Sequence, residues 1–151
     1  MNKKGEIGMS SQTVELLKEC NSGCKMAINS MNQIMEYVRN EEQADVIRSY
    51  KKKHQGLEDE IGKQLTLNGA REEEPGLMAS AMSWLSTEMK MSLRNDSNQV
   101  AKIMMDGCNM GIQSVSEYMN KYSAASKESL QLAKDLIKTE EDFMEEMKQF
   151  L

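Results

Sequence analysis

Four residues of metal-binding type fall on apolar helical stripes of this sequence: Cys24, His54, Cys108 and Glu140. Cysteine thiolate and histidine imidazole are ligands that zinc prefers, and soft sulfur ligands favour monovalent copper. Cys20 lies four residues before Cys24 on the same helix face, so the cysteines and the single histidine have the types needed for a tetrahedral Cys3His site. The pattern therefore makes these residues the candidate metal ligands, with zinc or copper as the ion.

A structural role competes with metal binding for these residues. His54 lies between Tyr50 and Leu57 on its stripe, and we favour a neutral core histidine hydrogen-bonded to a backbone or side-chain acceptor. Buried free cysteines behave as small hydrophobic side chains. When the first two expected helices are folded into a hairpin, His54 lies level with about Asn29, roughly 7 Å along the axis from Cys24. We therefore expect no bound cofactor, with zinc or copper as the alternative.

Glu140 lies on the inner stripe of the last expected helix. Folding that helix back on the preceding one places Glu140 level with Cys108. A carboxylate in the core must be paired, hydrogen-bonded or protonated, because an unpaired buried charge is costly. If the helix is rotated slightly, Glu140 lies instead at the edge of the stripe, in water.

Two glycines, Gly107 and Gly111, flank Cys108 inside an expected helix. Each costs about 1 kcal/mol relative to alanine, so the pair needs a compensating reason. We favour a packing reason, in which the glycines admit a neighbouring helix or a large side chain such as Tyr50 or Trp84. The alternative is a small cavity beside Cys108.

Methionine is abundant, with 15 residues in a chain of 151. Thioethers beside thiols suggest monovalent copper, but a flexible, strongly helix-forming side chain also suits the core of a helical protein. We favour core filling, because most of these residues fall on the apolar stripes: Met31, Met35, Met78, Met82, Met104, Met144 and Met147.

The elements that position these residues are helices. Proline occurs once and aromatic residues make up 5% of the chain, which is typical of helices rather than sheets. Apolar residues step by three and four over 14–38, 47–65, 104–122 and 130–151, and a shorter stripe covers 78–89. The first helix is expected to begin near Ser10 or Ser11, after a mobile tail at 1–10. A polar loop at 71–76, with Pro75, separates the two pairs of long helices.

This order predicts an all-α fold in one domain covering 11–151. Two helical hairpins joined by a long connection that holds a short helix are the arrangement of an antiparallel, ferritin-like four-helix bundle.

Three segments carry a family resemblance: LLKECNSGCKM at 16–26, MSWLSTEMKMSL at 82–93 and MDGCNMG at 105–111. In these segments the chain resembles the ferritin-like superfamily and, within it, a bacterial family found in anaerobic Firmicutes that has no established activity. The resemblance covers about residues 13–151. It implies the ferritin-like fold and a homo-oligomer, and it implies no chemistry.

The di-iron ligand pattern of the wider superfamily is missing. Its members place Glu-x-x-His on two of the four helices. Here Lys51 stands three residues before His54, Cys108 stands where a glutamate is expected, and Glu141 is followed by Met144 instead of histidine. One histidine cannot supply a site that needs two, so we do not expect a di-iron oxidase.

Charge and cysteine content limit the partners and the compartment. The net charge is −5, and acidic and basic residues alternate along the chain, which disfavours nucleic-acid binding. No apolar run approaches the ~20 residues of a membrane span, and no signal-peptide pattern follows the amino terminus. Three cysteines are too few for a disulfide framework. We therefore expect a cytoplasmic protein that binds neither membranes nor nucleic acid.

The function that these features favour is non-catalytic. The sequence offers no nucleophile–base pair and no phosphate-binding loop, so we expect a helical protein that acts by homo-oligomerisation or by binding a protein partner. Apolar residues beside the main stripes are expected to cover an exterior face: Leu16, Ile34, Leu67, Trp84 and Leu132. The alternative is a soft-metal or redox protein that uses Cys24, His54, Cys108 and nearby methionines.

Overall fold

The computed structural model describes residues 2–71, 86–93 and 96–151, with the side chains of 2–10, 87 and 88 excepted. These residues form five α-helices and a final 3-10 helix, and the described ranges contain no strand. The all-α prediction is confirmed. The elements are α1 (Asn2–Met35), α2 (Glu41–Leu67), α4 (Thr87–Ser92), α5 (Ser97–Lys121), α6 (Lys127–Met147) and η1 (Lys148–Phe150).

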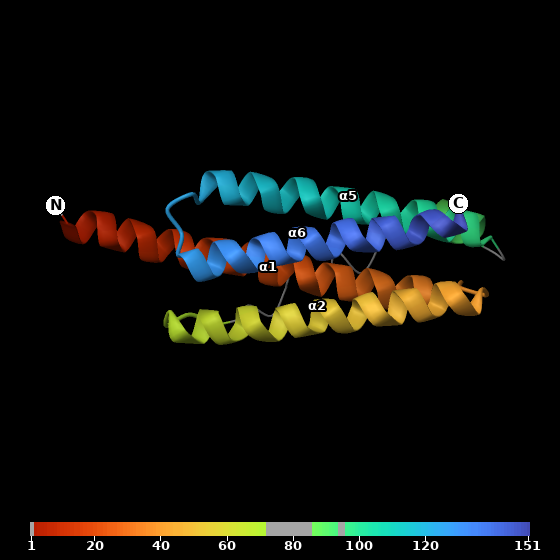
Figure 1. Ribbon diagram of the computed structural model, residues 1–151, viewed down its shortest axis with the longest axis horizontal. Coiled ribbons are helices and arrows are strands. Elements are labelled where there is room, and N and C mark those ends of the chain that lie inside the picture. The colour runs from red at the N-terminus through yellow and green to blue at the C-terminus, as the bar shows by residue number, and fades with distance from the viewer. Residues whose placement is uncertain (1, 72–85, 94–95) are drawn as a thin grey trace.

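The four long helices lie side by side (Figure 1). α1 and α2 run in opposite directions, as do α5 and α6, so the chain forms two helical hairpins. α1 packs against α2, α5 and α6, and α6 also packs against α2. α2 ends at the opposite end of the molecule from the start of α5, so residues 68–96 connect the two ends.

Side-chain caps define where the helices begin. Asn40 accepts a hydrogen bond from the Gln43 N–H at the start of α2, and Asp96 does the same for the Gln99 N–H at the start of α5. Ser126 caps α6 in the same way. These residues satisfy N–H groups that have no partner inside the helix. α2 ends before Gly69, whose positive φ of 73° is a conformation that suits glycine.

α1 begins earlier than the sequence suggested. Its first residue is Asn2, whereas the expected start was near Ser10 or Ser11. No proline interrupts residues 2–10, so the helical hydrogen-bond pattern can continue toward the amino terminus. The mobility expected for residues 1–10 stays a prediction. Of the short helix expected over 78–89, Met89 lies in α4, and Met78, Met82 and Leu85 lie outside the described residues.

The apolar stripes meet in two core clusters. Ile47, Tyr50 and Met104 belong to one, and Leu17 and Ile61 belong to the other. Most residues on the expected stripes are buried or half-buried.

α6 is rotated from its expected orientation. Leu136 and Phe143 are buried, while Ile137 and Met144 are half-buried. The expected stripe is therefore confirmed at Ala133, Glu140 and Met147 and is one position away from the core line at Leu136 and Phe143.

The expected exterior apolar face is partly wrong. Leu16 and Ile34 are 0% exposed, because α1 packs against three other helices and its buried stripe is correspondingly wide. Leu67 is 76% exposed, as expected, and Leu132 is half-buried. Trp84 lies outside the described residues.

Hydrogen bonds tie the two hairpins together at both ends. Gln43 Nε2 donates to the Ser97 carbonyl at 2.9 Å, which joins the start of α2 to the start of α5. At the other end, the Ser126 N–H donates to Thr13 Oγ1 at 2.8 Å, which joins the α5–α6 loop to α1. Between these ends, the rings of Tyr50 and Phe143 stack with centroids 4.8 Å apart. The two hydrogen bonds hold the hairpins together at their ends, and the ring stack limits how far α2 and α6 slide along one another.

Loss of the Thr13 hydroxyl should weaken the fold. Thr13→Val keeps the side-chain shape but leaves the Ser126 N–H without its acceptor, which should cost about 1–2 kcal/mol and lower Tm by about 2–8 °C in thermal unfolding. Thr139→Val is the matched control, because the Thr139 hydroxyl donates only to the Asp135 carbonyl of its own helix. Equal melting temperatures for the two variants would contradict this tie between the hairpins.

Candidate functional site

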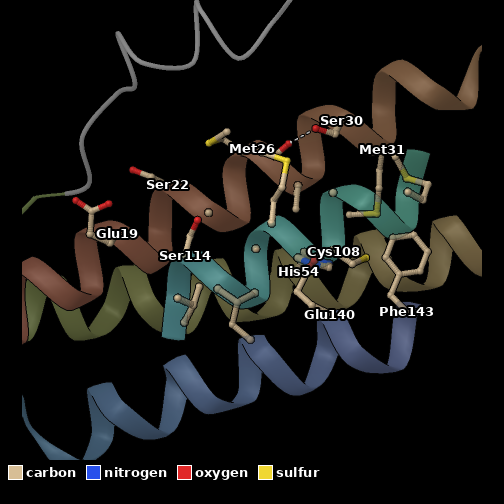
Figure 2. Close-up of a pocket in the computed structure, with 18 of the residues that line it drawn as sticks. Glu19, Ser22, Met26, Ser30, Met31, His54, Cys108, Ser114, Glu140 and Phe143 are labelled. Atoms are coloured by element: carbon tan, nitrogen blue, oxygen red, sulfur yellow. Dashed lines mark hydrogen bonds and ion pairs between the residues drawn. The ribbon is translucent and has the colours of Figure 1, made fainter. Parts of the chain in front are cut away.

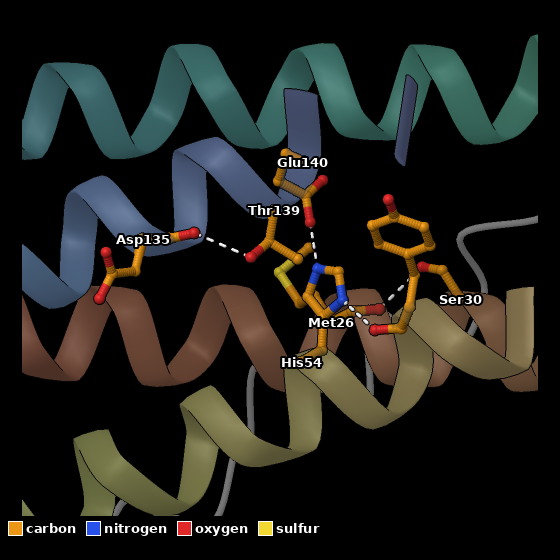
Figure 3. Close-up of polar contacts among 7 residues, drawn as sticks. Met26, Ser30, His54, Asp135, Thr139 and Glu140 are labelled. Atoms are coloured by element: carbon orange, nitrogen blue, oxygen red, sulfur yellow. Dashed lines mark hydrogen bonds and ion pairs between the residues drawn. The ribbon is translucent and has the colours of Figure 1, made fainter. Parts of the chain in front are cut away.

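His54 and Glu140 form a buried contact between α2 and α6 (Figure 3). The His54 side chain is 0% exposed and that of Glu140 is 7% exposed. His54 Nδ1 lies 2.6 Å from the Tyr50 carbonyl oxygen, one turn earlier in α2. A carbonyl only accepts, so Nδ1 carries a hydrogen and Nε2 faces Glu140 Oε1. The hydrogen bond between Nε2 and Oε1 therefore needs one proton, carried either by the imidazole or by the carboxyl group.

The surroundings of His54 favour its charged form. Burial by itself lowers the pKa of His54, but the hydrogen bond and the charge of Glu140, together with the Tyr50 carbonyl, outweigh it. The net pKa is raised above its ordinary value of 6.5. The pair thus contributes stability that is fully present below pH 6.5 and is lost as pH rises through the raised pKa of His54. The expected backbone and side-chain acceptors are both found, at Tyr50 and Glu140, and the direction of the pKa shift favours a charged ring over the neutral ring that was expected.

Cys108 of α5 joins this pair. Its thiol hydrogen-bonds to the Glu140 carboxylate, as expected from the level at which the two residues lie. Burial first, and the Glu140 charge second, raise the pKa of Cys108 far above its usual range. Cys108 is therefore a protonated donor to Glu140, and it is not a thiolate nucleophile.

The other two cysteines are equally unreactive by their surroundings. Burial, with a smaller effect of Glu19, raises the pKa of Cys20 to about 12. Burial, followed by the neighbouring Cys20 and Glu140, raises the pKa of Cys24 well above its ordinary value. Both thiols belong to the core cluster around Leu17. They act as small apolar side chains in the core.

A cavity of about 210 Å³ lies between α1 and α5, with His54, Cys108 and Glu140 at its base (Figure 2). Its walls are mostly apolar. α1 contributes Gly23, Met26, Ala27 and Met31, α5 contributes Met104, Gly107, Met110, Gly111 and Val115, and α6 contributes Leu136 and Phe143.

Polar side chains stand apart from the base. Glu19, Ser22 and Ser114 lie together at one end of the cavity in Figure 2. The Tyr118 hydroxyl of α5 hydrogen-bonds to the Glu19 carboxylate of α1. This bond bridges the two helices that form the walls. The Ser30 hydroxyl, also on the lining, donates to the Met26 carbonyl at 2.8 Å.

Gly111 faces the carboxylate directly. A Cβ at this position would lie 3.3 Å from Glu140 Oε2, closer than an ordinary van der Waals contact. Gly111 and Gly107 also line the cavity. Both expectations for Gly111, close packing of a neighbour and a cavity beside Cys108, are therefore met. The neighbour that packs against Gly111 is the Glu140 carboxylate and not Tyr50, whose ring stacks on Phe143.

The candidate metal ligands are only partly brought together. His54, Cys108 and Glu140 form one contact group, whereas Cys24 is 0% exposed and is not on the cavity lining. Within residues 2–71, 86–93 and 96–151, no three His, Cys, Asp or Glu side chains are arranged to hold a metal ion. Metal binding stays a prediction.

A small cavity beside Cys108 was the less favoured alternative in the sequence interpretation, and the part that α1 plays in forming it was missed. A signal for it was present, because small residues four apart occur on both walls: Gly23 and Ala27 on α1, and Gly107 and Gly111 on α5. Small residues on facing helices usually permit close packing. Here part of the space that they leave is unfilled.

Comparisons with protein-family models, with curated proteins and with solved structures find no match for this chain. The ferritin-like resemblance therefore stays an expectation. Among the described helices, none is long and apolar enough to cross a membrane.

His54 can be titrated by NMR without ambiguity, because it is the single histidine. We expect a pKa above 6.5 in the wild type. Glu140→Gln removes the carboxylate that favours the charged ring, so the effect of burial should dominate and the pKa of His54 should fall below 6.5. Glu141→Gln, which changes the exposed neighbour on α6, should leave the titration unchanged. A wild-type pKa below 6.5 would contradict the charged pair.

Gly111→Ala and Gly56→Ala test the contact at Gly111. A Cβ at Gly56 meets no atom within 4 Å, so this substitution should stabilise α2 by about 1 kcal/mol and raise Tm by about 2–4 °C. Gly111→Ala should fall clearly short of that gain, because the methyl group presses on Glu140. In a Glu140→Ala background the full gain should return. Equal increases in Tm for the two single variants would contradict a contact between Gly111 and Glu140.

Proposed function

We propose that this chain is a non-catalytic binding protein that holds a small, mostly apolar molecule in the cavity between α1 and α5. The main support for this proposal is the cavity of about 210 Å³, which has apolar walls and one group of buried polar side chains at its base. Small-molecule sites commonly combine such walls with a few convergent polar groups. A cavity of ~150 Å³ in an engineered core holds benzene, so the volume here suits a molecule of about 8–9 non-hydrogen atoms.

The side chains at the base support binding rather than catalysis. Covalent catalysis needs an activated nucleophile, and the Cys108 thiol is held protonated by burial and by Glu140. His54 is bonded to Glu140 and to the Tyr50 carbonyl, and its nitrogens are therefore occupied. What the base offers a ligand is a charged pair that can orient a polar group.

We further propose that the four long helices form a ferritin-like bundle. Two antiparallel hairpins, joined by residues that connect opposite ends of the molecule, support this connectivity.

A homo-oligomer, or a complex with a protein partner, is proposed from exposed apolar side chains. Met26 and Met110 are 42% and 58% exposed on the two cavity walls, and Leu67 and Met91 are 76% and 66% exposed. Free thiols at all three cysteines support a reducing compartment, which we propose to be the cytoplasm.

Monovalent copper is the second candidate occupant. Met26, Met31, Met104 and Met110 line the cavity beside Cys108, and thioether and thiol sulfur are the ligands that this ion prefers. Elemental analysis of protein purified without a metal-affinity tag separates the two candidates. Stoichiometric copper, or stoichiometric zinc at the Cys24, His54, Cys108 and Glu140 set, would replace the small-molecule proposal.

Filling the cavity should abolish binding of an apolar probe. Ethylbenzene should raise Tm of the wild type and shift backbone amide signals of α1 and α5 in NMR spectra. Ala27→Leu places a larger side chain on the cavity wall and should remove both effects. Asn32→Leu is the matched control, because it adds a leucine to α1 at an exposed position away from the lining. Equal responses of the two variants would overturn the cavity as the binding site.

A further inference from the structure

We infer that the cavity selects a small apolar amine, bound as its ammonium ion against Glu140. This inference rests on the proposed binding function and names the class of ligand. Its basis is the balance of charge and of hydrogen-bonding groups around the cavity.

The charged side chains on the lining are unequal in sign. Glu19 and Glu140 supply two carboxylates and His54 supplies one imidazole, while the described lining contains no lysine and no arginine. With His54 committed to Glu140, the remaining field from the lining is negative. An anionic ligand such as a carboxylic acid would enter this space without a cationic partner, and an ammonium ion would be attracted.

Hydrogen-bond donors at the base of the cavity are already used, whereas acceptors are left; the Ser22 and Ser114 hydroxyls lie apart from the base, at the end with Glu19. Tyr118 donates to Glu19, Ser30 donates to the Met26 carbonyl, and both ring nitrogens of His54 are occupied. A carboxylate has about four acceptor positions, and a thiol is a weak donor. Glu140 therefore retains acceptor capacity after bonding to His54 and Cys108.

The open side of Glu140 faces Gly111. Its Oε2 atom is the atom that a Cβ at Gly111 would meet at 3.3 Å, and Gly111 itself lines the cavity. Because glycine has no side chain, the carboxylate is not screened from the cavity at this point. An ammonium group can reach Oε2 there while its apolar part lies along the walls formed by Met26 and Met31 (Figure 2).

Binding of a cation next to Glu140 should cause the His54 ring to lose its positive charge. Two thiols lie close enough to Glu140 for its charge to raise their pKa, Cys24 on α1 and Cys108 on α5, and burial keeps both of them neutral; on α2 the Tyr50 carbonyl accepts from Nδ1. When ammonium pairs with Glu140, His54 releases one proton to solvent and keeps its Nδ1–H bond to the Tyr50 carbonyl. The NMR signals of His54 should move from the charged toward the neutral ring as the amine is added.

Three probes that share a phenyl ring and a two-carbon chain test the ligand class: 2-phenylethylamine, ethylbenzene and phenylacetate. Each is titrated by calorimetry and NMR at pH 7. The amine should bind about tenfold tighter than ethylbenzene, because the ammonium–carboxylate bond is charge-assisted, and phenylacetate should bind most weakly. Glu140→Gln, whose folding is checked by its melting curve, should bind the amine and ethylbenzene about equally. Glu141→Gln, on the exposed face of the same helix, should keep the preference.

Gly111→Ala provides a second variant that keeps the carboxylate. Its methyl group obstructs Oε2, so the amine should lose more affinity than ethylbenzene does. Tightest binding of ethylbenzene or of phenylacetate to the wild type would overturn the inference and leave the proposed cavity function standing. Loss of the amine preference in Glu19→Gln, with Glu140→Gln unaffected, would overturn Glu140 as the recognition group. Binding of none of the three probes would instead count against the proposed function.

Discussion

The buried contact between His54 and Glu140 is the interaction on which the arrangement of the helices depends. Taking an imidazolium and a carboxylate out of water costs several kcal/mol per ion, and only close, well-oriented pairing recovers that cost. The stack of Tyr50 on Phe143, one turn away on the same two helices, holds α2 and α6 at the spacing that this pairing needs. Cys108 then adds a bond from α5, so three helices meet at one carboxylate. Small sliding of any of them would leave a charge in the core without a partner.

Much of this arrangement is contained in the periodicity of the sequence. The three-and-four spacing places His54, Cys108 and Glu140 on inward stripes, and the length of the last hairpin puts Glu140 level with Cys108, as the structure has it. Which residues of two antiparallel helices lie at the same height follows from the rise per residue alone. The contact of His54 with Glu140 could not be predicted in this way. It depends on α2 and α6 being neighbours, and the spacing of apolar residues does not indicate which helices are neighbours in the bundle.

The features that escaped sequence interpretation are those set by small rotations and by empty space. Leu136 and Phe143 are buried on α6 where Ile137 and Met144 were expected, a shift of one residue between two stripes of nearly equal apolar character. The contribution of α1 to the cavity escaped for a related reason. Glycine and alanine on facing helices indicate only that side chains are small, and whether the backbones close the gap is decided by the contacts elsewhere along the helices.

Those contacts lie at the two ends of the molecule, at Gln43 with Ser97 and at Thr13 with Ser126. With the hairpins fixed at both ends, α1 and α5 cannot move together in the middle unless one of them bends, and an intact helix resists bending. These ties at the two ends favour keeping the gap between α1 and α5 open in the folded state. An occupant would find the space already formed, so association would carry little reorganisation cost and its rate would be set by encounter and desolvation instead of by a closing motion.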